Sequence, residues 1–264
     1  MADSRLTALS LCSGIGGIEL GLSEWVRVLG YVERDAYAAS VLLARMEDET
    51  LESAPIWCGD LQDFPASEFA GVDLITAGFP CQPFSQAGKR EREQDKRHLW
   101  PQIAECIRVA EPWLVFLENV QLRAFREPFR DLRDMGFTVS NPCACTASEL
   151  GAGHRRRRVF VLAHRDGAEL RLQQGWRRGA SGEEATKPAN AASDAHDSRE
   201  LQPGGSLSQE RGRYCDPTRW SAEPGVARVV HGLPDRVDRE RCLGNAVVPA
   251  QARLAFSRLL GGLT

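Results

Sequence analysis

The most constraining feature of the sequence is the regular alternation of short apolar runs with amphipathic stretches over residues 1–163. Apolar runs of strand length occupy residues 6–11, 31–33, 56–58, 72–77, 113–117, 137–143 and 159–163. Helical periodicity covers the stretch from 18 to about 29 and residues 36–45, 99–110 and 122–135. Strands that alternate with helices predict an α/β fold with a doubly wound, mostly parallel sheet. In such a sheet, ligands bind at the carboxyl ends of the strands.

The sequence changes character after residue 163. Residues 164–219 are rich in Arg, Gly, Ser, Glu and Gln, and few of their positions are apolar. Such a stretch cannot bury enough apolar surface to offset the entropy lost on ordering, so we expect a poorly structured insert. Residues 247–260 have helical spacing and end at a Gly-Gly stop signal. We therefore predict a first domain over 1–163, an insert over 164–219 and a C-terminal segment, 220–264, that returns to the first domain.

The composition excludes several classes of protein. The chain has 264 residues with 33 basic and 36 acidic side chains, so bulk positive charge does not hold it to nucleic acid, although a local basic face remains open. No apolar run approaches the roughly 18 residues that span a bilayer, and we see no signal-peptide pattern. The eight cysteines form no C-x-x-C pair and the histidines do not cluster with them. We therefore expect a cytoplasmic protein with reduced thiols, no metal site and no membrane contact. We also expect it to be a monomer.

A glycine-rich turn follows the first predicted strand. The turn Ser13-Gly14-Ile15-Gly16-Gly17 lets backbone N–H groups approach a ligand closely, although its spacing differs from the dinucleotide pattern G-x-G-x-x-G. Glu33 ends the second strand, where an acid can bind a ribose diol, and Asp60 ends the third. Each feature alone also fits a tight connection or a solvated surface acid. In order, at three strand ends, they predict a nucleoside-type ligand.

Cys81 lies just past the fourth predicted strand, in the segment GFPCQPFSQAG of residues 78–88. Most cysteines are small buried hydrophobes, whereas a nucleophilic thiolate needs an exposed, polar position. Pro80 and Pro83 stiffen this turn, and polar side chains surround the thiol. The charged stretch 89–97 follows and has the composition of a flap that closes over a substrate. We interpret Cys81 as a candidate nucleophile.

Two further charged features lie at strand ends. Glu118 directly follows the fifth predicted strand. A carboxyl buried there is costly to ionise, and the resulting raised pKa suits a proton donor to a ring nitrogen; the alternative is a helix cap. An arginine run over 155–158 precedes the last predicted strand, where alternation puts Arg156 and Arg158 on one side, although such runs are usually solvated. Beside Cys81, we favour the catalytic interpretation of Glu118.

Taken together, these motifs resemble the DNA cytosine-5 methyltransferase family. The matching positions are 11–17 with Glu19, Glu33 with Asp35, Gly59-Asp60, Pro80-Cys81-Gln82, Asp95 with Arg97 and Leu99, Glu118-Asn119-Val120, Arg156 with Arg158, and Gly244-Asn245 with Pro249. Each match is weak to moderate alone, but their order and spacing are very specific. The resemblance implies the Rossmann-like fold of S-adenosylmethionine-dependent methyltransferases.

The resemblance also implies an activity and roles for individual residues. The activity is transfer of a methyl group from S-adenosylmethionine to C5 of a cytosine flipped out of duplex DNA. Cys81 would attack C6, Glu118 would donate to N3, and Arg156 or Arg158 would hold O2. The cofactor would lie against Cys12, Ser13, Gly14, Gly16, Gly17, Glu33, Asp60, Pro80 and Asn245. The expected DNA contacts are Gln82, Ser85, Lys89 and Arg97. A cognate restriction endonuclease is a further partner that the family suggests.

The chain departs from the family pattern in three places. Cys12 stands where the family usually has Phe, and His154 stands where Gln usually precedes the Arg-x-Arg motif. The family's target-recognition region lies between that motif and Gly-Asn, and here only the short stretch 164–219 is available, as in compact phage or prophage-type members. This predicts a short or relaxed target sequence, or a linker without a role. Two alternatives remain open: a member that binds DNA and cofactor with little turnover, and an RNA cytosine-5 methyltransferase.

Overall fold

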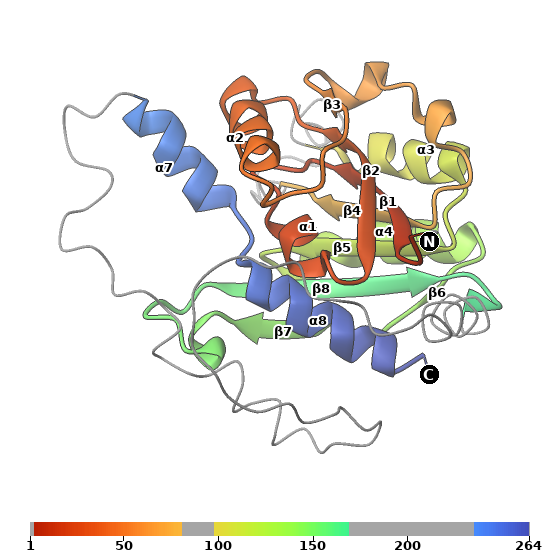
Figure 1. Cartoon of the computed structure of the whole chain (residues 1–264). Helices are drawn as coiled ribbons and strands as arrows, with labels where there is room; N and C mark the ends of the chain where they lie inside the picture. The colour runs from red at the N-terminus through yellow and green to blue at the C-terminus, as the bar shows by residue number, and fades with distance from the viewer. Residues whose placement is uncertain (1–2, 81–97, 169–234, 264) are drawn as a thin grey trace, which may run out of the picture.

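The computed structural model describes residues 3–80, 98–168 and 235–263, and they form an α/β fold (Figure 1). Within them, a sheet of eight strands lies between two layers of helices. The strands are β1 (Leu6–Leu11), β2 (Val26–Val32), β3 (Ile56–Trp57), β4 (Leu74–Gly78), β5 (Leu114–Asn119), β6 (Thr138–Val139), β7 (Cys143–Thr146) and β8 (Arg157–His164). Neighbours among β1 to β5 are parallel, whereas β8 is antiparallel to β5, β6 and β7. The predicted α/β fold with a mostly parallel sheet is confirmed.

The order of the strands creates a switch point in the middle of the sheet. The order is β3-β2-β1-β4-β5-β8-β6, with β7 also paired to β8. The chain runs outwards from β1 to β3, then returns to β4 on the other side of β1 and continues in the opposite direction. The loops after β1 and β4 therefore diverge and leave a crevice at the carboxyl ends of these strands, where ligands bind in sheets of this kind.

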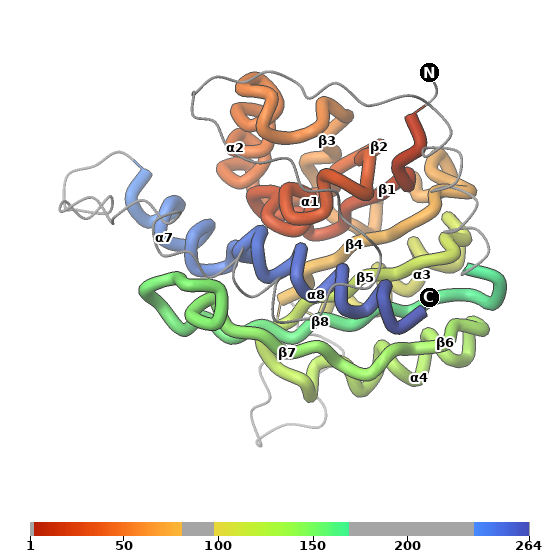
Figure 2. Tube along the Cα trace, turned by 60° about the horizontal axis from the view of Figure 1, so that its bottom comes forward, coloured from red at the N-terminus to blue at the C-terminus, as the bar shows by residue number. Residues whose placement is uncertain are grey.

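Helices cover both faces of the sheet (Figure 2). They are α1 (Gly17–Leu22), α2 (Ala36–Glu47), α3 (Trp100–Ala110), α4 (Arg126–Asp134), α7 (Arg236–Asn245) and α8 (Pro249–Gly261). One apolar cluster joins the sheet to α3 through Trp100 and to α4 through Leu132. A second cluster on the other face includes Leu42 of α2 and Phe256 of α8. Across the described ranges, no helix combines the length and apolar character that a membrane crossing requires.

Strand β5 shows why the sheet is buried on both sides. All six of its residues are buried, as expected for a central strand covered by helices on both faces. Alternate side chains face opposite layers: Val115 belongs to the cluster with α3, and Phe116 belongs to the cluster with α8. The Phe116 ring stacks on Phe160 of β8 at 5.5 Å between centroids and meets Phe256 edge-on at 5.2 Å. This packing fixes the strand that carries Glu118.

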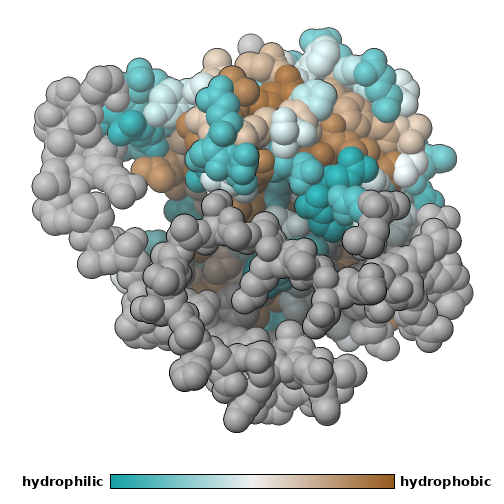
Figure 3. All heavy atoms as spheres, viewed as in Figure 1, coloured by the Kyte–Doolittle hydropathy of each residue, from teal (hydrophilic) through white to brown (hydrophobic). Residues whose placement is uncertain are grey.

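Helix α7 is attached to the fold by a small contact with α2. Cys242 of α7 packs with Ile15 and Ala38 in a separate apolar cluster. Figure 1 shows α7 projecting from the molecule beside α2, and Figure 3 shows that its outer part is hydrophilic. After a short connection the chain enters α8, which packs against α1, β7 and β8. The sequence did not predict α7, because its apolar positions lack helical spacing.

Two predicted elements are wrong in their extent. The helix expected from 18 to about 29 ends at Leu22, and β2 begins at Val26, because the alternating buried valines 26 and 28 favour a strand. The strand expected over 137–143 is split into β6 and β7. Pro142 lies between them and has no N–H to donate, so the ladder with β8 is interrupted there.

The close approach of α1 and α8 predicts the effect of a small substitution. A Cβ atom on Gly21 would lie 2.4 Å from the carbonyl oxygen of Pro249, so Gly21→Ala must push the helices apart. Overpacking of this kind costs about 1–3 kcal/mol. We expect a lower midpoint of urea unfolding. The control is Gly153→Ala, where a Cβ meets nothing within 4 Å. Equal midpoints for the two variants would contradict this prediction.

Candidate active site

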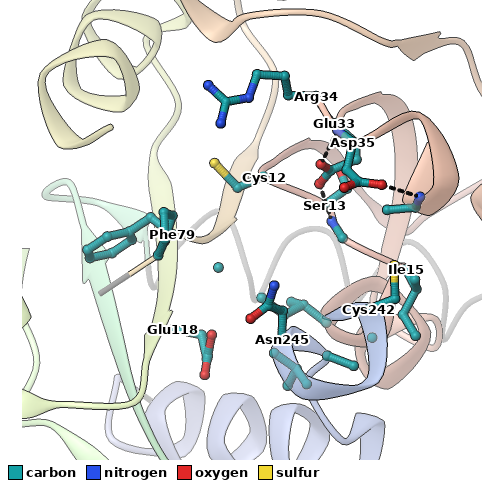
Figure 4. A pocket seen from close by; sticks show the side chains of 18 of the residues that line it. Cys12, Ser13, Ile15, Glu33, Arg34, Asp35, Phe79, Glu118, Cys242 and Asn245 are labelled. Atoms are coloured by element: carbon teal, nitrogen blue, oxygen red, sulfur yellow. Dashed lines mark hydrogen bonds between the residues drawn. The ribbon is translucent and has the colours of Figure 1, made fainter. Parts of the chain in front are cut away.

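A cavity of about 580 Å³ opens at the switch point of the sheet (Figure 4). Its walls are the segments that follow β1, β2, β3 and β4, the end of β5, the start of β8 and the connection between α7 and α8. It brings together most of the residues predicted from the sequence: Cys12, Ser13, Gly14, Gly17, Glu33, Asp60, Pro80, Glu118, Arg158 and Asn245. Gly16 and Arg156 do not line it. Figure 4 shows Glu118, Asn245 and Phe79 around one side of this space, opposite Glu33 and Asp35.

The turn after β1 requires glycine at two places for different reasons. Gly16 has φ +77, a left-handed conformation that disfavours side chains, and a Cβ there would meet Leu51 at 2.5 Å. Gly17 begins α1, and a Cβ there would lie 2.3 Å from the carbonyl oxygen of Val247. Gly16 therefore shapes the turn without reaching the cavity. Gly17 lets the turn pack directly against the segment that carries Asn245.

Glu33 holds this turn to the end of β2. One carboxylate oxygen accepts the N–H of Gly14 at 2.7 Å, and the other accepts the N–H of Asp35 at 2.8 Å. Asp35 in turn caps α2 by accepting the N–H of Ala38 at 3.0 Å. Each oxygen of a carboxylate can accept more than one hydrogen bond. Glu33 is therefore fixed in orientation and still has acceptor capacity for a ligand in the cavity.

Glu118 is a buried acid where β5 meets the cavity. It pairs with Gly78 of β4 in the sheet, and its Oε1 lies 2.9 Å from Nε of Arg158. The two side chains are only 7% and 8% exposed. Burial raises the pKa of Glu118 to about 7, although the charges of Arg158 and Arg156 oppose this change. Within the described residues, Oε1 is itself buried and has no hydrogen-bond partner of good geometry, which adds to the cost of ionising the carboxyl. The residue nevertheless lines the cavity.

Arg156 and Arg158 have different surroundings. Arg158 lines the cavity beside Glu118, whereas Arg156 turns towards the connection between α7 and α8. The Arg156 guanidinium donates to the carbonyl of Gly244 at 2.8 Å and also to the carbonyl of Ala246. These carbonyls flank Asn245. Arg156 therefore positions the Asn245 segment, a contact that spacing along the chain did not reveal.

The segment that leads to Cys81 is anchored next to Glu118. Asn119 donates from Nδ2 to the carbonyl of Phe79 at 3.0 Å, and the Phe79 ring packs edge-on against Phe125. Pro80 lines the cavity. Cys81 itself lies outside the described residues, and so do Gln82, Ser85, Lys89, Asp95 and Arg97. Their roles stay predictions.

Several cavity residues were not among the predicted ligands. Arg34 follows Glu33 directly, and Arg241 and Cys242 come from the unpredicted α7. Arg241 forms an ion pair with Asp35, which links α7 to the N-terminus of α2 across the cavity edge.

Cys12, one of the predicted ligands, lines the cavity, and burial raises the pKa of its thiol to about 12. This thiol stays neutral and is therefore a poor nucleophile.

Comparison with known proteins connects this site to methyltransferases. The family model described as C-5 cytosine-specific DNA methylase matches residues 6–216. Type II methyltransferase M.NgoBI of Neisseria gonorrhoeae is 33% identical over 168 residues, which are 60% of this chain and 50% of that protein. M.HpaII of Haemophilus parainfluenzae is 30% identical over 168 residues, 60% of this chain and 46% of that protein. The chain thus spans about half the length of the curated relatives it matches.

Solved structures show the same fold at lower identity. The Dnmt2 methyltransferase of S. pombe is 22% identical, with a TM-score of 0.51 over 61% of this chain and 51% of that chain. The Entamoeba histolytica methyltransferase EhMeth is 12% identical, with a TM-score of 0.59 over 98% of this chain and 99% of that chain. Their similarity supports the arrangement of sheet and helices described above.

The buried Glu118 predicts a dependence of stability on pH. The pKa of the folded-state carboxyl, about 7, lies above the ordinary value of 4.5. The contribution of the protonated acid to the free energy of unfolding is therefore fully present below pH 4.5 and is lost as the pH rises through 7. In the wild-type protein this lowers the free energy of unfolding by about 2 kcal/mol between pH 5 and 7.5, and we expect Glu118→Gln to abolish that decrease. Urea unfolding at both pH values measures this. The control is the exposed Glu105→Gln; if both variants follow the wild-type pH dependence, the buried acid is not responsible.

Proposed function

Because the chain belongs to the C-5 cytosine-specific DNA methylase family, we propose that it transfers a methyl group from S-adenosylmethionine to C5 of a flipped-out cytosine in duplex DNA. The observation that carries the proposal is the buried pair of Glu118 and Arg158, 2.9 Å apart, beside the strand that leads to Cys81. A buried acid with a pKa near 7 can hold a proton at neutral pH and give it to a ring nitrogen.

The residues of the cavity fit S-adenosylmethionine, which when bound supplies an electrophilic methyl group. Glu33 offers oriented carboxylate oxygens for the ribose hydroxyls, and Gly14 has open space where a Cβ would be, so a ligand can approach its backbone. Asp60 would take the adenine edge and Asn245 the methionine end. The volume of about 580 Å³ lies within the 300–1,000 Å³ of typical small-molecule sites.

The residues on the base side would act in a defined sequence. The Cys81 thiolate forms a bond to C6 of the cytosine while Glu118 gives its proton to N3, so negative charge does not accumulate on the ring. C5 would thereby become nucleophilic and take the methyl group, whose bond to the sulfonium sulfur breaks to leave S-adenosylhomocysteine. The C5 proton then leaves to a base, the bond from sulfur to C6 breaks, and N3 returns its proton to Glu118. Arg158 orients the Glu118 carboxyl and would hold O2 of the base.

Other parts of the chain would serve the DNA substrate. Gln82, Ser85, Lys89 and Arg97 would bind the DNA, the last three through its phosphates. We assign target recognition to the insert, 164–219, between the catalytic domain, 1–163, and the C-terminal segment, 220–264. We further propose a cytoplasmic monomer that works beside a cognate restriction endonuclease, because two of the matched relatives are type II methyltransferases.

The decisive test is methyl transfer to unmethylated duplex DNA, followed by bisulfite sequencing. We expect methylated cytosines with the wild-type protein and none with Cys81→Ser. Cys58→Ser is the matched control, because Cys58 is exposed and does not line the cavity. A covalent adduct with DNA that contains 5-fluorocytosine should likewise depend on Cys81. Methylation of tRNA instead of duplex DNA would overturn the choice of substrate, and cofactor binding without any methylation would overturn the catalytic role.

The proton donor predicts the pH dependence of the chemical step. If Glu118 must be protonated, the single-turnover rate falls as the pH rises above about 7, the pKa of its carboxyl. Glu118→Gln should slow the step by about 10²–10⁴-fold and abolish this alkaline limb. Rapid-quench methyl transfer from pH 6 to 9 measures both effects. An unchanged alkaline limb in the variant would assign the proton to another group.

A further inference from the structure

Gln251 is a fully buried amide in the first turn of α8. Its Nε2 donates to the carbonyl of Cys145 in β7 at 3.0 Å and to the carbonyl of Arg156 at 2.8 Å. An apolar side chain at this place would leave two backbone carbonyls without these donors, and a buried unpaired carbonyl is costly. Gln251 thus connects α8 to two other segments, neither of which is its sequence neighbour.

The residue that Gln251 holds has a strained backbone. Arg156 has φ +28, in the left-handed region that disfavours residues with a side chain. Such conformations cost about 1–3 kcal/mol and persist where the surroundings over-determine them. Here the carbonyl of Arg156 is bound by Gln251, and its guanidinium is bound by the carbonyls of Gly244 and Ala246. The segment from 244 to 251 therefore fixes Arg156 at both its backbone and its side chain.

Arg156 does not line the cavity itself, but it is connected to two groups of residues that do. Two residues further along, Arg158 contacts Glu118 on the base side. On the cofactor side, the carbonyls that Arg156 binds flank Asn245, and this segment lines the cavity. A change in the backbone at Arg156 must therefore displace Arg158, the Asn245 segment, or both.

We propose that Gln251 is a positioning residue that keeps Arg156 in its left-handed conformation and thereby couples the cofactor side of the cavity to the Glu118–Arg158 pair. The inference rests on the proposed function. A cofactor that binds against the Asn245 segment stabilises the same arrangement that places Arg158 beside Glu118. Because the Gln251 contacts support an arrangement that both sides share, their loss weakens cofactor binding and slows the chemical step together.

The test compares Gln251→Leu, which removes both donors, with Leu260→Ala, which loosens the far end of the same helix through apolar packing away from the cavity. Binding of S-adenosylhomocysteine is measured by calorimetry, and single-turnover methyl transfer is measured at a temperature where both variants are folded. We expect Gln251→Leu to weaken binding about 5–30-fold, within the range typical of coupling between sites, and to slow the chemical step. Leu260→Ala should lower only the unfolding midpoint. Equal binding and rates for the two variants overturn the proposal.

A double variant shows whether Gln251 acts through Arg156. If it does, Gln251→Leu adds little to the loss of binding already caused by Arg156→Ala, because residues in one network are not additive. Fully additive losses overturn this route. The binding measurement needs no DNA or turnover, so it separates the two proposals. A wild-type protein that binds S-adenosylhomocysteine but methylates nothing overturns the proposed function, and a selective loss of binding in Gln251→Leu still supports the positioning role.

Discussion

The contact between Glu118 and Arg158 depends on the antiparallel pairing of β5 and β8, which meet at one edge of the sheet. β5 ends there, and β8 begins there because it is antiparallel to β5. A parallel β8 would have put its first residues at the far edge, away from the cavity. The single reversal in an otherwise parallel centre thus brings the arginine run beside the buried acid. The antiparallel pairing also brings the connection after α7 within reach, because Arg156 precedes β8 directly.

Helix α1 carries a second buried acid against the same sheet, and its neighbours give it a different role. Glu19 is 4% exposed, and burial raises the pKa of its carboxyl, as it does for Glu118. However, one Glu19 oxygen accepts hydroxyl hydrogen bonds from Ser10 of β1 and Thr76 of β4, both at 2.7 Å. These bonds join the two strands at the switch point. Glu19 therefore ties the sheet together, whereas Glu118 faces the cavity and can exchange a proton with a ligand.

The local parts of the structure could be predicted from sequence, because their signals lie within a few residues. The apolar run of β1, the glycine turn and the acid Glu33 all follow from patterns within one strand and one turn. The boundary between α1 and β2 was wrong, because apolar spacing supports a helix and a strand about equally over such a short stretch. Helix α7 was missed because half of its residues are charged and only Cys242 is buried, so it shows no apolar face.

The different contacts of Arg156 and Arg158 could be identified only from the structure. Strand alternation predicted that Arg156 and Arg158 lie on one side, and this was wrong. Arg156 adopts a left-handed backbone just before β8, so its side chain turns to the connection between α7 and α8, whereas Arg158 lines the cavity. The partners of Arg156 lie about ninety residues further along the chain, beyond any pattern that periodicity can detect. The left-handed backbone at Arg156 is held by a hydrogen bond from Gln251 of α8. The backbone just before Arg158 is thus held in place only when α8 is packed on the sheet, so our proposed site includes a contact from the C-terminal helix.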